Sequence, residues 1–304
     1  MKRIKTISEF HQFRQLPPPE HPLLSVTEIN LVKRTVDTTS MNWCYDFYAI
    51  GMKRASFSNT INFRYGQQPF DFNEGILSFV APNQVLSLSI DTKQETTQSG
   101  WLLLVHPDFL WNTSLAKSIR KFDFWDYSVH ESLFLSAKEE AILIQTFQNI
   151  QQEYHANIDR FSKQIIIAQI ESLLSYADRF YHRQFITREK ANHQLLEKLE
   201  TILEDYFSRD KLATKGLPTV QYISETLNVS PTYLRGLLKV LTGQSTQQLI
   251  HDKLIEKAKE KLSVTNFSIS EIAYSLGFEH PQSFTKLFKG KTNLSPLAYR
   301  QTLN

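Results

Sequence analysis

The last third of this 304-residue chain contains the same pattern twice. The segments VQYISETLNVSPTYLRGLLKVL and SEIAYSLGFEHPQSFTKLF place apolar residues at matching positions, with one extra residue in the second copy. Ile223 and Leu227 in the first copy align with Ile272 and Leu276 in the second. Each copy is typical of a helix, a tight turn and a second helix. The C-terminal part is therefore predicted to be helical and built on a repeated unit.

Helix start signals repeat along the same region. Ser230-Pro231 and His280-Pro281 each place a possible cap before a proline at the first helical position, where the missing N–H is harmless. Two capping boxes, Ser245 with Gln248 and Ser268 with Glu271, open further helices. We expect helix-turn-helix units at about 219–242 and 268–290, joined by a long helix through Leu262.

A helix-turn-helix unit can place its second helix in the major groove of DNA. The charge distribution favours such a partner, because the segment from Lys215 onward holds 11 basic and 6 acidic residues, whereas the chain as a whole has a net charge of +3. The alternative is a helical bundle that serves only for packing. The doubled turn, the capped short helices and the basic excess favour binding to double-stranded DNA.

The second helix of each unit supplies the candidate DNA-contacting side chains. Leu234 and Leu238 in the first, and Phe284 and Phe288 in the second, define inward faces, so the remaining polar side chains should point outward. Gln, Arg and Lys can pair with base edges, while Ser, Thr and Lys suit phosphates. Lys257, Lys259 and Lys261 of the long helix are better explained as solvated residues. The DNA-binding candidates are Ser230, Thr232, Tyr233, Arg235, Lys239, His280, Gln282, Ser283, Thr285, Lys286 and Lys289.

Residues 188–304 resemble the DNA-binding domain of the AraC/XylS family. The residues that carry the resemblance are Ser270-Glu271-Ile272-Ala273, Gly277-Phe278, Phe284, Phe288-Lys289, Ser295-Pro296 and Tyr299-Arg300. The resemblance implies a bacterial-type transcription regulator, an activator more often than a repressor, that binds promoter DNA and contacts RNA polymerase. The family's usual Arg in the linker helix is replaced by Lys253 at best, which cannot make the same two-pronged contact.

The first part of the chain has a different pattern. Residues 20–110 contain short aromatic and β-branched segments, such as WCYDFYAIGM, ILSFVAPNQVLSLSI and GWLLLVHP, separated by Gly and Pro. This pattern predicts an antiparallel β-barrel or double-sheet sandwich at about 20–115, followed by a helical hairpin at about 136–183 that Ser136 and Glu139 begin with a capping box. The polar segment 184–192 is the expected linker. The predicted fold class is α+β, with domains 1–187 and 188–304.

The family resemblance implies that residues 1–187 form a cupin-like domain that binds a small effector and makes the protein a homodimer. Candidates for an effector pocket are Trp43, Tyr45, Phe47, Phe63 and Tyr65, although ordinary packing in the core of the barrel explains these aromatic residues better. We expect no catalytic residue, metal site or cofactor. One cysteine, no secretory leader and no membrane-spanning run favour the cytoplasm.

Two other functions stay open at this point. The N-terminal domain could serve only for dimerisation, without an effector. It could instead be a cupin-type small-molecule enzyme fused to a DNA-binding domain, although the histidine set that holds a cupin metal is not found in FNEGILSFVAPNQVLSL.

Overall fold

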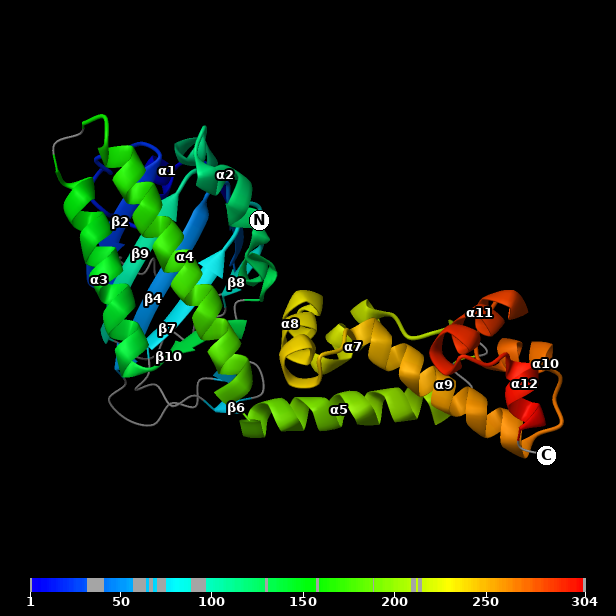
Figure 1. Cartoon of the computed structure of the whole chain (residues 1–304). Helices are drawn as coiled ribbons and strands as arrows, with labels where there is room; N and C mark the ends of the chain where they lie inside the picture. The colour runs from blue at the N-terminus through cyan, green and yellow to red at the C-terminus, as the bar shows by residue number, and fades with distance from the viewer. Residues whose placement is uncertain are drawn as a thin grey trace. The chain divides into compact units, whose positions relative to one another are not determined.

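Figure 1 shows a computed structural model of the chain. The structure describes residues 2–302 except 32–40, 57–63, 66–67, 70–74, 89–96, 129–130, 157–158, 188, 209–211 and 213–214. The chain divides into two compact units, Met1–Gln184 and Phe185–Asn304, and each is described by itself. No helix in the described ranges is both long and apolar enough to cross a membrane.

The first unit is built on a five-stranded antiparallel sheet. Its central strand β4 pairs with β7 on one side and β9 on the other, so that Ile50 lies opposite both Phe79 and Leu103. The side chains of these apolar residues are buried. In order across the sheet, the strands are β10 (Leu133–Leu135), β7 (Gly75–Val80), β4 (Tyr48–Ser56), β9 (Thr97–Val105) and β2 (Leu24–Glu28).

A smaller sheet joins strands from distant parts of the chain. It contains β1 (Lys2–Ile4), β3 (Met41–Tyr45) and β8 (Leu86–Leu88), and a separate two-stranded ribbon contains β5 (Arg64–Tyr65) and β6 (Gln68–Pro69). The mixed α and β class is confirmed. The described strands form separate sheets and not one closed barrel, so the cupin-like barrel stays a prediction.

The segment WCYDFYAIGM is not one strand, as its alternation suggested. It contributes to β3 and then to β4, which lie in different sheets. The break falls at Asp46, whose carboxylate accepts a hydrogen bond from Arg3 Nε at 2.7 Å and whose backbone N–H donates to the carbonyl of Ile4. These contacts turn the chain between the two strands, and both neighbouring segments remain buried.

Helix α1 (Ile7–Phe13) was not anticipated from the sequence. It begins at Thr6, whose hydroxyl accepts from the backbone N–H of Glu9 while the Glu9 carboxylate accepts from the backbone of Thr6. The pattern Thr-Ile-Ser-Glu is a capping-box signal that could have predicted this helix. Ile7 and Phe10 are buried against the small sheet and the inner face of β4 and β9.

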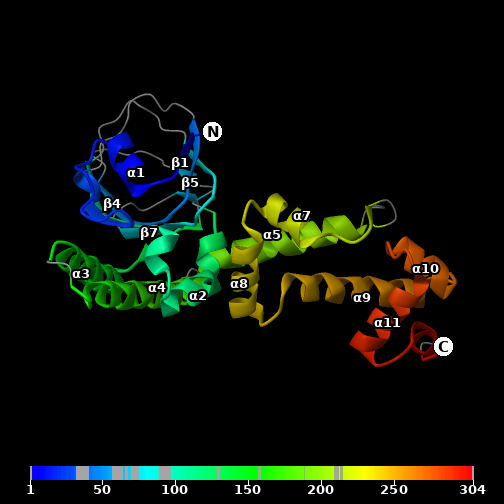
Figure 2. The same ribbon diagram turned by 90° about the horizontal axis from the view of Figure 1, so that it is seen from above.

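Helices α3 (Ala137–Tyr154) and α4 (Ser162–Thr187) cover the other face of the five-stranded sheet (Figures 1 and 2). The predicted capping box of Ser136 and Glu139 is confirmed. Phe147 of α3 stacks on Trp101 of β9 at a centroid separation of 6.0 Å. The unit also contains five described short elements: η1 (Ile29–Leu31), η2 (Pro107–Leu110), α2 (Ser114–Ser118), η3 (Ile119–Lys121) and η4 (Asp123–Asp126).

The boundary between the two compact units falls within the predicted linker at 184–192, but most of this segment is helical. Helix α4 continues to Thr187, and α5 (Glu189–Ser208) follows after one residue. Gln184 is polar but buried: its side-chain oxygen accepts from the backbone N–H of Phe134, and its amide donates to the carbonyl of Ser132. The polar Gln184 therefore reflects satisfied hydrogen bonds within a folded helix, not the absence of structure.

The second unit is helical and contains the predicted repeat. A single hydrophobic core combines residues of α5 with residues of the helices that follow it, so neither helix-turn-helix unit has a core of its own. These helices are α7 (Val220–Leu227), α8 (Pro231–Thr242), α9 (Thr246–Val264), α10 (Ile269–Ser275), α11 (Pro281–Thr292) and α12 (Pro296–Gln301).

The repeat extends to the backbone conformation of its turns. Asn228 (φ 57°) and Gly277 (φ 81°) occupy the left-handed region at equivalent positions between the two helices of each unit. Gly243 (φ 72°) and Asn293 (φ 62°) do the same at the ends of α8 and α11. Gly and Asn are the residues that adopt this region at least cost, so each unit is closed at both points by the residue type its geometry needs.

Gly277 is also required for close packing, and its substitution is our first prediction. A Cβ atom at Gly277 would lie 2.7 Å from the carbonyl oxygen of Leu212 and 3.1 Å from the Cα of Gly216. We expect Gly277→Ala to lower the free energy of local unfolding of α10 and α11 by at least about 2 kcal/mol, from backbone strain plus the clash. Amide hydrogen exchange of these helices measures this change.

Two other glycines provide matched controls. Gly243→Ala has the same backbone strain but open space around the new methyl group, so it should cost only about 1–2 kcal/mol. Gly290→Ala, inside α11 with nothing within 4 Å, should stabilise the helix by about 0.5–1 kcal/mol. An equal loss for Gly277→Ala and Gly243→Ala would show that the approach of Leu212 is unimportant.

Candidate DNA-binding surface

The second helix of each helix-turn-helix unit, α8 or α11, is anchored by a fully buried apolar face. In α8, Leu234, Leu237 and Leu238 have no exposed surface, and in α11 the same holds for Phe284 and Phe288. The α11 rings belong to a larger aromatic cluster, because Phe284 contacts Phe278 at 5.5 Å and Phe288 contacts Tyr299 at 5.5 Å between centroids. Burial of these faces fixes which side of each helix faces outward.

The predicted DNA-contacting side chains lie on the remaining faces of α8 and α11. Seven of them are exposed, and four at the helix starts or flanks are half-buried. The exposed ones are Arg235, Lys239, His280, Gln282, Ser283, Lys286 and Lys289, and the half-buried ones are Ser230, Thr232, Tyr233 and Thr285. Their contacts with DNA stay a prediction.

Local hydrogen bonds limit what some of these side chains can do. The Ser230 hydroxyl accepts from the backbone N–H of Tyr233 at 3.1 Å, and the Thr285 hydroxyl donates to the carbonyl of Pro281 at 3.0 Å. His280 was expected to cap α11, but its ring makes no capping hydrogen bond and is exposed. Its backbone still starts the helix, since the His280 carbonyl accepts from Ser283 N–H at 3.0 Å.

Tyr233 of α8 packs against an aromatic ring from outside the repeat. Its ring lies edge-on to Phe185, with centroids 5.1 Å apart and planes at 71°. Phe185, at the C-terminal end of α4, is only 2% exposed. Helix α8, the second helix of the first helix-turn-helix unit, therefore contacts the C-terminal end of α4. The two residues are 48 positions apart, and no sequence pattern predicts this contact.

Helix α9 connects the two helix-turn-helix units through a polar contact that sequence patterns also do not reveal. The Asp252 carboxylate accepts from Lys291 Nζ of α11 at 2.6 Å and from Gln244 Nε2 of the turn after α8 at 2.9 Å. The adjacent His251 has its pKa lowered by burial and by the Lys291 charge. Asp252 thus ties the ends of both recognition helices to α9.

Two lysines of α9, Lys253 and Lys257, are paired with acidic residues. Lys253 lies 3.0 Å from Glu256 and 3.6 Å from Glu204 of α5, and the hydrogen bond with Glu256 raises its pKa. Lys257 pairs with Glu260 at 2.8 Å. These lysines are therefore engaged within the protein, unlike Lys286 and Lys289, for which no ion pair occurs within the described part of the chain.

The predicted effector-pocket residues are only partly described. Trp43, Tyr45 and Phe47 come together in the core between the two sheets, at 2%, 5% and 0% exposure. Phe63 and the side chain of Tyr65 lie outside the described residues.

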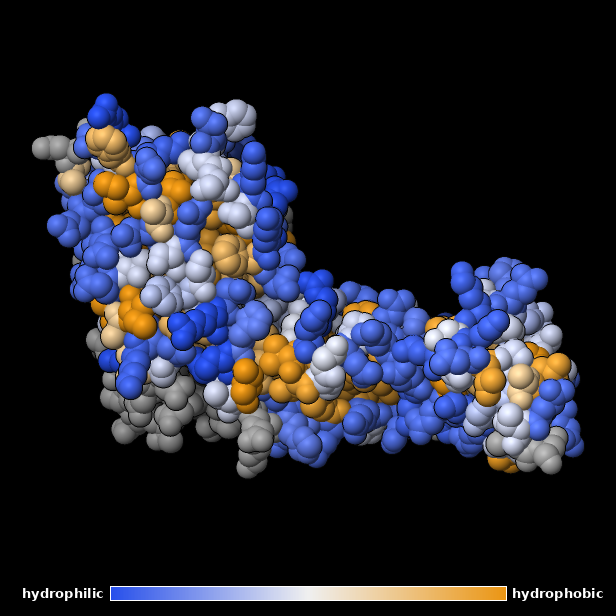
Figure 3. All heavy atoms as spheres, in the orientation of Figure 1, coloured by the Kyte–Doolittle hydropathy of each residue, from blue (hydrophilic) through white to orange (hydrophobic). Residues whose placement is uncertain are grey.

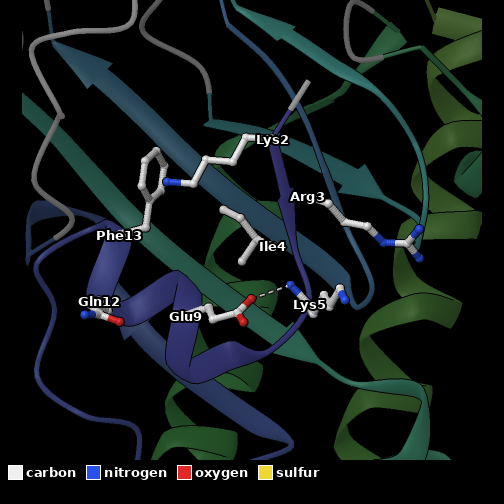
Figure 4. Close-up of a pocket in the computed structure, with 7 residues that line it drawn as sticks. All are labelled: Lys2, Arg3, Ile4, Lys5, Glu9, Gln12 and Phe13. Atoms are coloured by element: carbon white, nitrogen blue, oxygen red, sulfur yellow. Dashed lines mark hydrogen bonds between the residues drawn. The ribbon is translucent and has the colours of Figure 1, made fainter.

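A surface pocket lies close to this cluster, between β1 and α1, and holds about 360 Å³ (Figure 4). Among its lining residues, Ile4 lies between Lys2 and Phe13 on one side and Glu9 and Lys5 on the other. Within the described ranges, no group of three or more His, Cys, Asp or Glu side chains could hold a metal ion.

Two helix-turn-helix units on one core, each with an exposed polar recognition face, define a DNA-binding domain. A helix-turn-helix domain model matches residues 223–302. The chain is 30% identical to the multiple antibiotic resistance protein MarA of Escherichia coli over 110 residues. This matched region covers 36% of this chain and 78% of MarA. The chain belongs to the AraC/XylS family.

Other relatives match the same part of the chain. An uncharacterised transcriptional regulator of Bacillus subtilis, YobQ, is 34% identical over 85 residues, which are 28% of this chain and 35% of YobQ. The C-terminal domain of AraT, a response regulator from Geobacillus stearothermophilus, is 31% identical over 36% of this chain and 84% of that structure, with a TM-score of 0.32. The chain spans less than half the length of several curated relatives that it matches.

Substitution of α11 side chains gives the second prediction. If Gln282 and Lys286 reach base edges, Gln282→Ala or Lys286→Ala should each weaken specific binding by about 1–3 kcal/mol and relax base preference at one position. Competition binding with a set of single-base variants of the DNA site measures both effects.

Lys257→Ala is the matched control, because Lys257 carries the same charge but is paired with Glu260 on α9. It should leave base preference unchanged. A uniform loss across all DNA sequences for Lys286→Ala would indicate a phosphate contact, and unchanged binding for both α11 variants would contradict the groove-facing orientation of this helix.

Proposed function

We propose that this protein is a sequence-specific DNA-binding transcription regulator of the AraC/XylS type that acts as an activator at promoters. The proposal rests on the packing of α8 and α11 against one shared core. Each helix buries its apolar face in this core and exposes the polar face on its other side. Rigid attachment to α9 suits the reading of two successive major-groove segments. An activator of this type would work by recruiting RNA polymerase to the promoter. Because promoter DNA is the proposed target, we propose that the protein acts in the cytoplasm.

The N-terminal unit is proposed to control how the recognition helices settle on DNA, through a population shift. Helix α4 begins at Ser162 in the first unit and ends at Thr187 in the second unit. Its residue Phe185 contacts Tyr233 of α8. A small effector bound in the first unit, or a partner, would act on this helix. The buried aromatic residues Trp43, Tyr45 and Phe47 support an effector site, although they also serve as core.

A homodimer is proposed to form through the outer surface of the α3–α4 pair. Phe161 and Ile165, at the start of α4, are 49% and 44% exposed, and Trp111 nearby is 77% exposed. Lys163 Nζ donates to the carbonyl of Trp111 at 3.0 Å, so Trp111 lies beside the start of α4. Figure 3 shows apolar side chains at the surface over α3 and α4. Such side chains suit burial against a second copy.

The function is tested by mapping the DNA sites that the purified protein binds in the genomic DNA of its host, followed by transcription from those promoters with the host RNA polymerase. We expect a common motif with two elements about 10 base pairs apart, one for each recognition helix, and increased transcription. A dimer would protect two copies of this motif. Binding without any common motif would contradict sequence-specific recognition, and decreased transcription would indicate a repressor.

The link between α4 and α8 gives a separate prediction. An edge-on aromatic pair contributes about 0.5–1.5 kcal/mol beyond its buried area. If the Phe185 contact holds Tyr233 away from DNA, Phe185→Ala should raise specific affinity by about twofold to tenfold, measured by fluorescence anisotropy with labelled DNA.

Tyr233→Phe is the control, because it keeps the ring contact and removes only the hydroxyl group. It should leave the effect of Phe185 intact. Lower affinity in Phe185→Ala, with the fold retained by circular dichroism, would show that Phe185 supports the binding position of α8 and does not restrain it.

A further inference from the structure

The side chain of Asp252, on α9, joins the C-terminal ends of the two recognition helices, α8 and α11. Its Oδ1 atom accepts a hydrogen bond at 2.6 Å from the Nζ atom of Lys291, which lies in the last turn of α11. Its Oδ2 atom accepts at 2.9 Å from the Nε2 atom of Gln244, which follows the end of α8 by two residues. One carboxylate therefore holds one contact from each helix-turn-helix unit.

The two donors move with the helices that they belong to. The backbone N–H of Gln244 donates to the Thr242 hydroxyl at 3.2 Å, and that hydroxyl donates to the carbonyl of Leu238 within α8 at 2.8 Å. Lys291 lies within the helical part of α11, close to its C-terminal end. A shift of either helix end would therefore displace a donor that Asp252 binds.

The backbone of Asp252 is itself held in place by the core. Ile250, Leu254 and Ile255 of α9 are buried in the hydrophobic cluster of the second unit. Apolar packing is strong but non-directional, so it prevents a large rotation of α8 and α11 without fixing the positions of their ends. Hydrogen bonds to two separate carboxylate oxygens depend on distance and angle, and they supply this restraint.

The bridge is too exposed to contribute much to overall stability. The side chains of Asp252 and Lys291 are 40% and 31% exposed, and water screens an ion pair of this kind. DNA geometry is more sensitive, because one inserted base pair moves one DNA element by about 3.4 Å and turns it by about 35° relative to the other. A restraint on the helix ends can therefore change the choice of DNA site and leave the fold nearly as stable.

We propose that Asp252 is a positioning residue that determines which separation of the two DNA elements the protein accepts. By binding Lys291 and Gln244 together, it sets the distance and tilt between α8 and α11. This inference rests on the proposed reading of two major-groove segments by these helices. It assigns part of the specificity to a residue that pairs with no base.

The first experiment measures binding of the full chain to DNA sites that differ only in the separation of the two elements. Fluorescence anisotropy compares the separation found in the genomic sites with separations one base pair longer and one shorter. We expect the wild type to bind the altered sites at least about tenfold more weakly, because one helix must leave its base edges. Asp252→Ala should reduce this difference to about threefold or less and leave base preference within each element unchanged.

Two further variants separate positioning from a loss of charge or of stability. Glu260→Ala is the matched control, because it removes the same charge from α9, but Glu260 pairs with Lys257 of the same helix at 2.8 Å. It should keep the full spacing preference. Exchange of the charges, Asp252→Lys with Lys291→Asp, should restore most of the preference. The new ammonium group can donate both to the new carboxylate and to the side-chain oxygen of Gln244.

A distance measurement without DNA tests the same restraint directly. Spin labels are attached through Lys239→Cys in α8 and Lys289→Cys in α11, because both positions are exposed. Cys44 is buried, and the parent chain controls for its labelling. We expect a narrow distribution of label distances with Asp252 present, a wider one after Asp252→Ala, and a narrow one again after the charge exchange.

Either of two results would overturn the proposal: the same spacing preference in Asp252→Ala as in the wild type, or an unchanged distance distribution in this variant. An equal loss of preference in Glu260→Ala would show that charge on α9 is responsible and not the bridge. If the exchanged variant does not fold, Lys291→Met and Gln244→Ala replace it, and each should remove part of the preference. If no specific DNA sequence is bound at all, the proposed function fails, whereas the distance measurement still decides the role of Asp252.

Discussion

The hydrophobic core around α9 is the interaction on which the second unit depends. Leu254, Ala258 and Leu262 of this helix are buried in the same cluster as Leu234 and Leu238 of α8 and as Phe284 and Phe288 of α11. Full burial of each large side chain is worth about 1.5–3 kcal/mol, so the recognition helices cannot turn on α9 without a loss of several such terms. The outward faces, and with them any DNA contact, follow from this packing.

The repeated unit could be predicted from the sequence because its signals are local. Apolar spacing, Ser230 before Pro231 and the capping boxes of Ser245 and Ser268 act within one or two turns, and the structure confirms all three caps. The turns follow the same logic, since Asn228 and Gly277 are residue types that tolerate positive φ. The exception is His280, whose ring can cap a helix in principle but here points to solvent.

Features that depend on distant residues could not be predicted in this way. The alternation around Asp46 fits one strand, and only its contacts with Arg3 and Ile4 divide the segment between two sheets. The segment after Arg183 resembled an unstructured linker because it is polar and shows no apolar pattern. The sequence does not reveal that Gln184 satisfies its amide with Phe134 and Ser132, 50 and 52 residues away. Helix α1 is different: its capping box was visible in the sequence, but so short a helix has little periodicity to support it.

The two recognition helices differ in how free they are to meet DNA. In α11, Gln282 and Lys286 are exposed, and the aromatic cluster behind them fixes the helix. In α8, Gly236 offers no side chain and Tyr233 already contacts Phe185. Base reading should therefore fall mainly on α11, while α8, joined through Phe185 to the helix that leaves the first unit, is the better point for control. Regulation at α8 would change affinity without altering the sequence that α11 selects, because specificity and affinity would then depend on different helices.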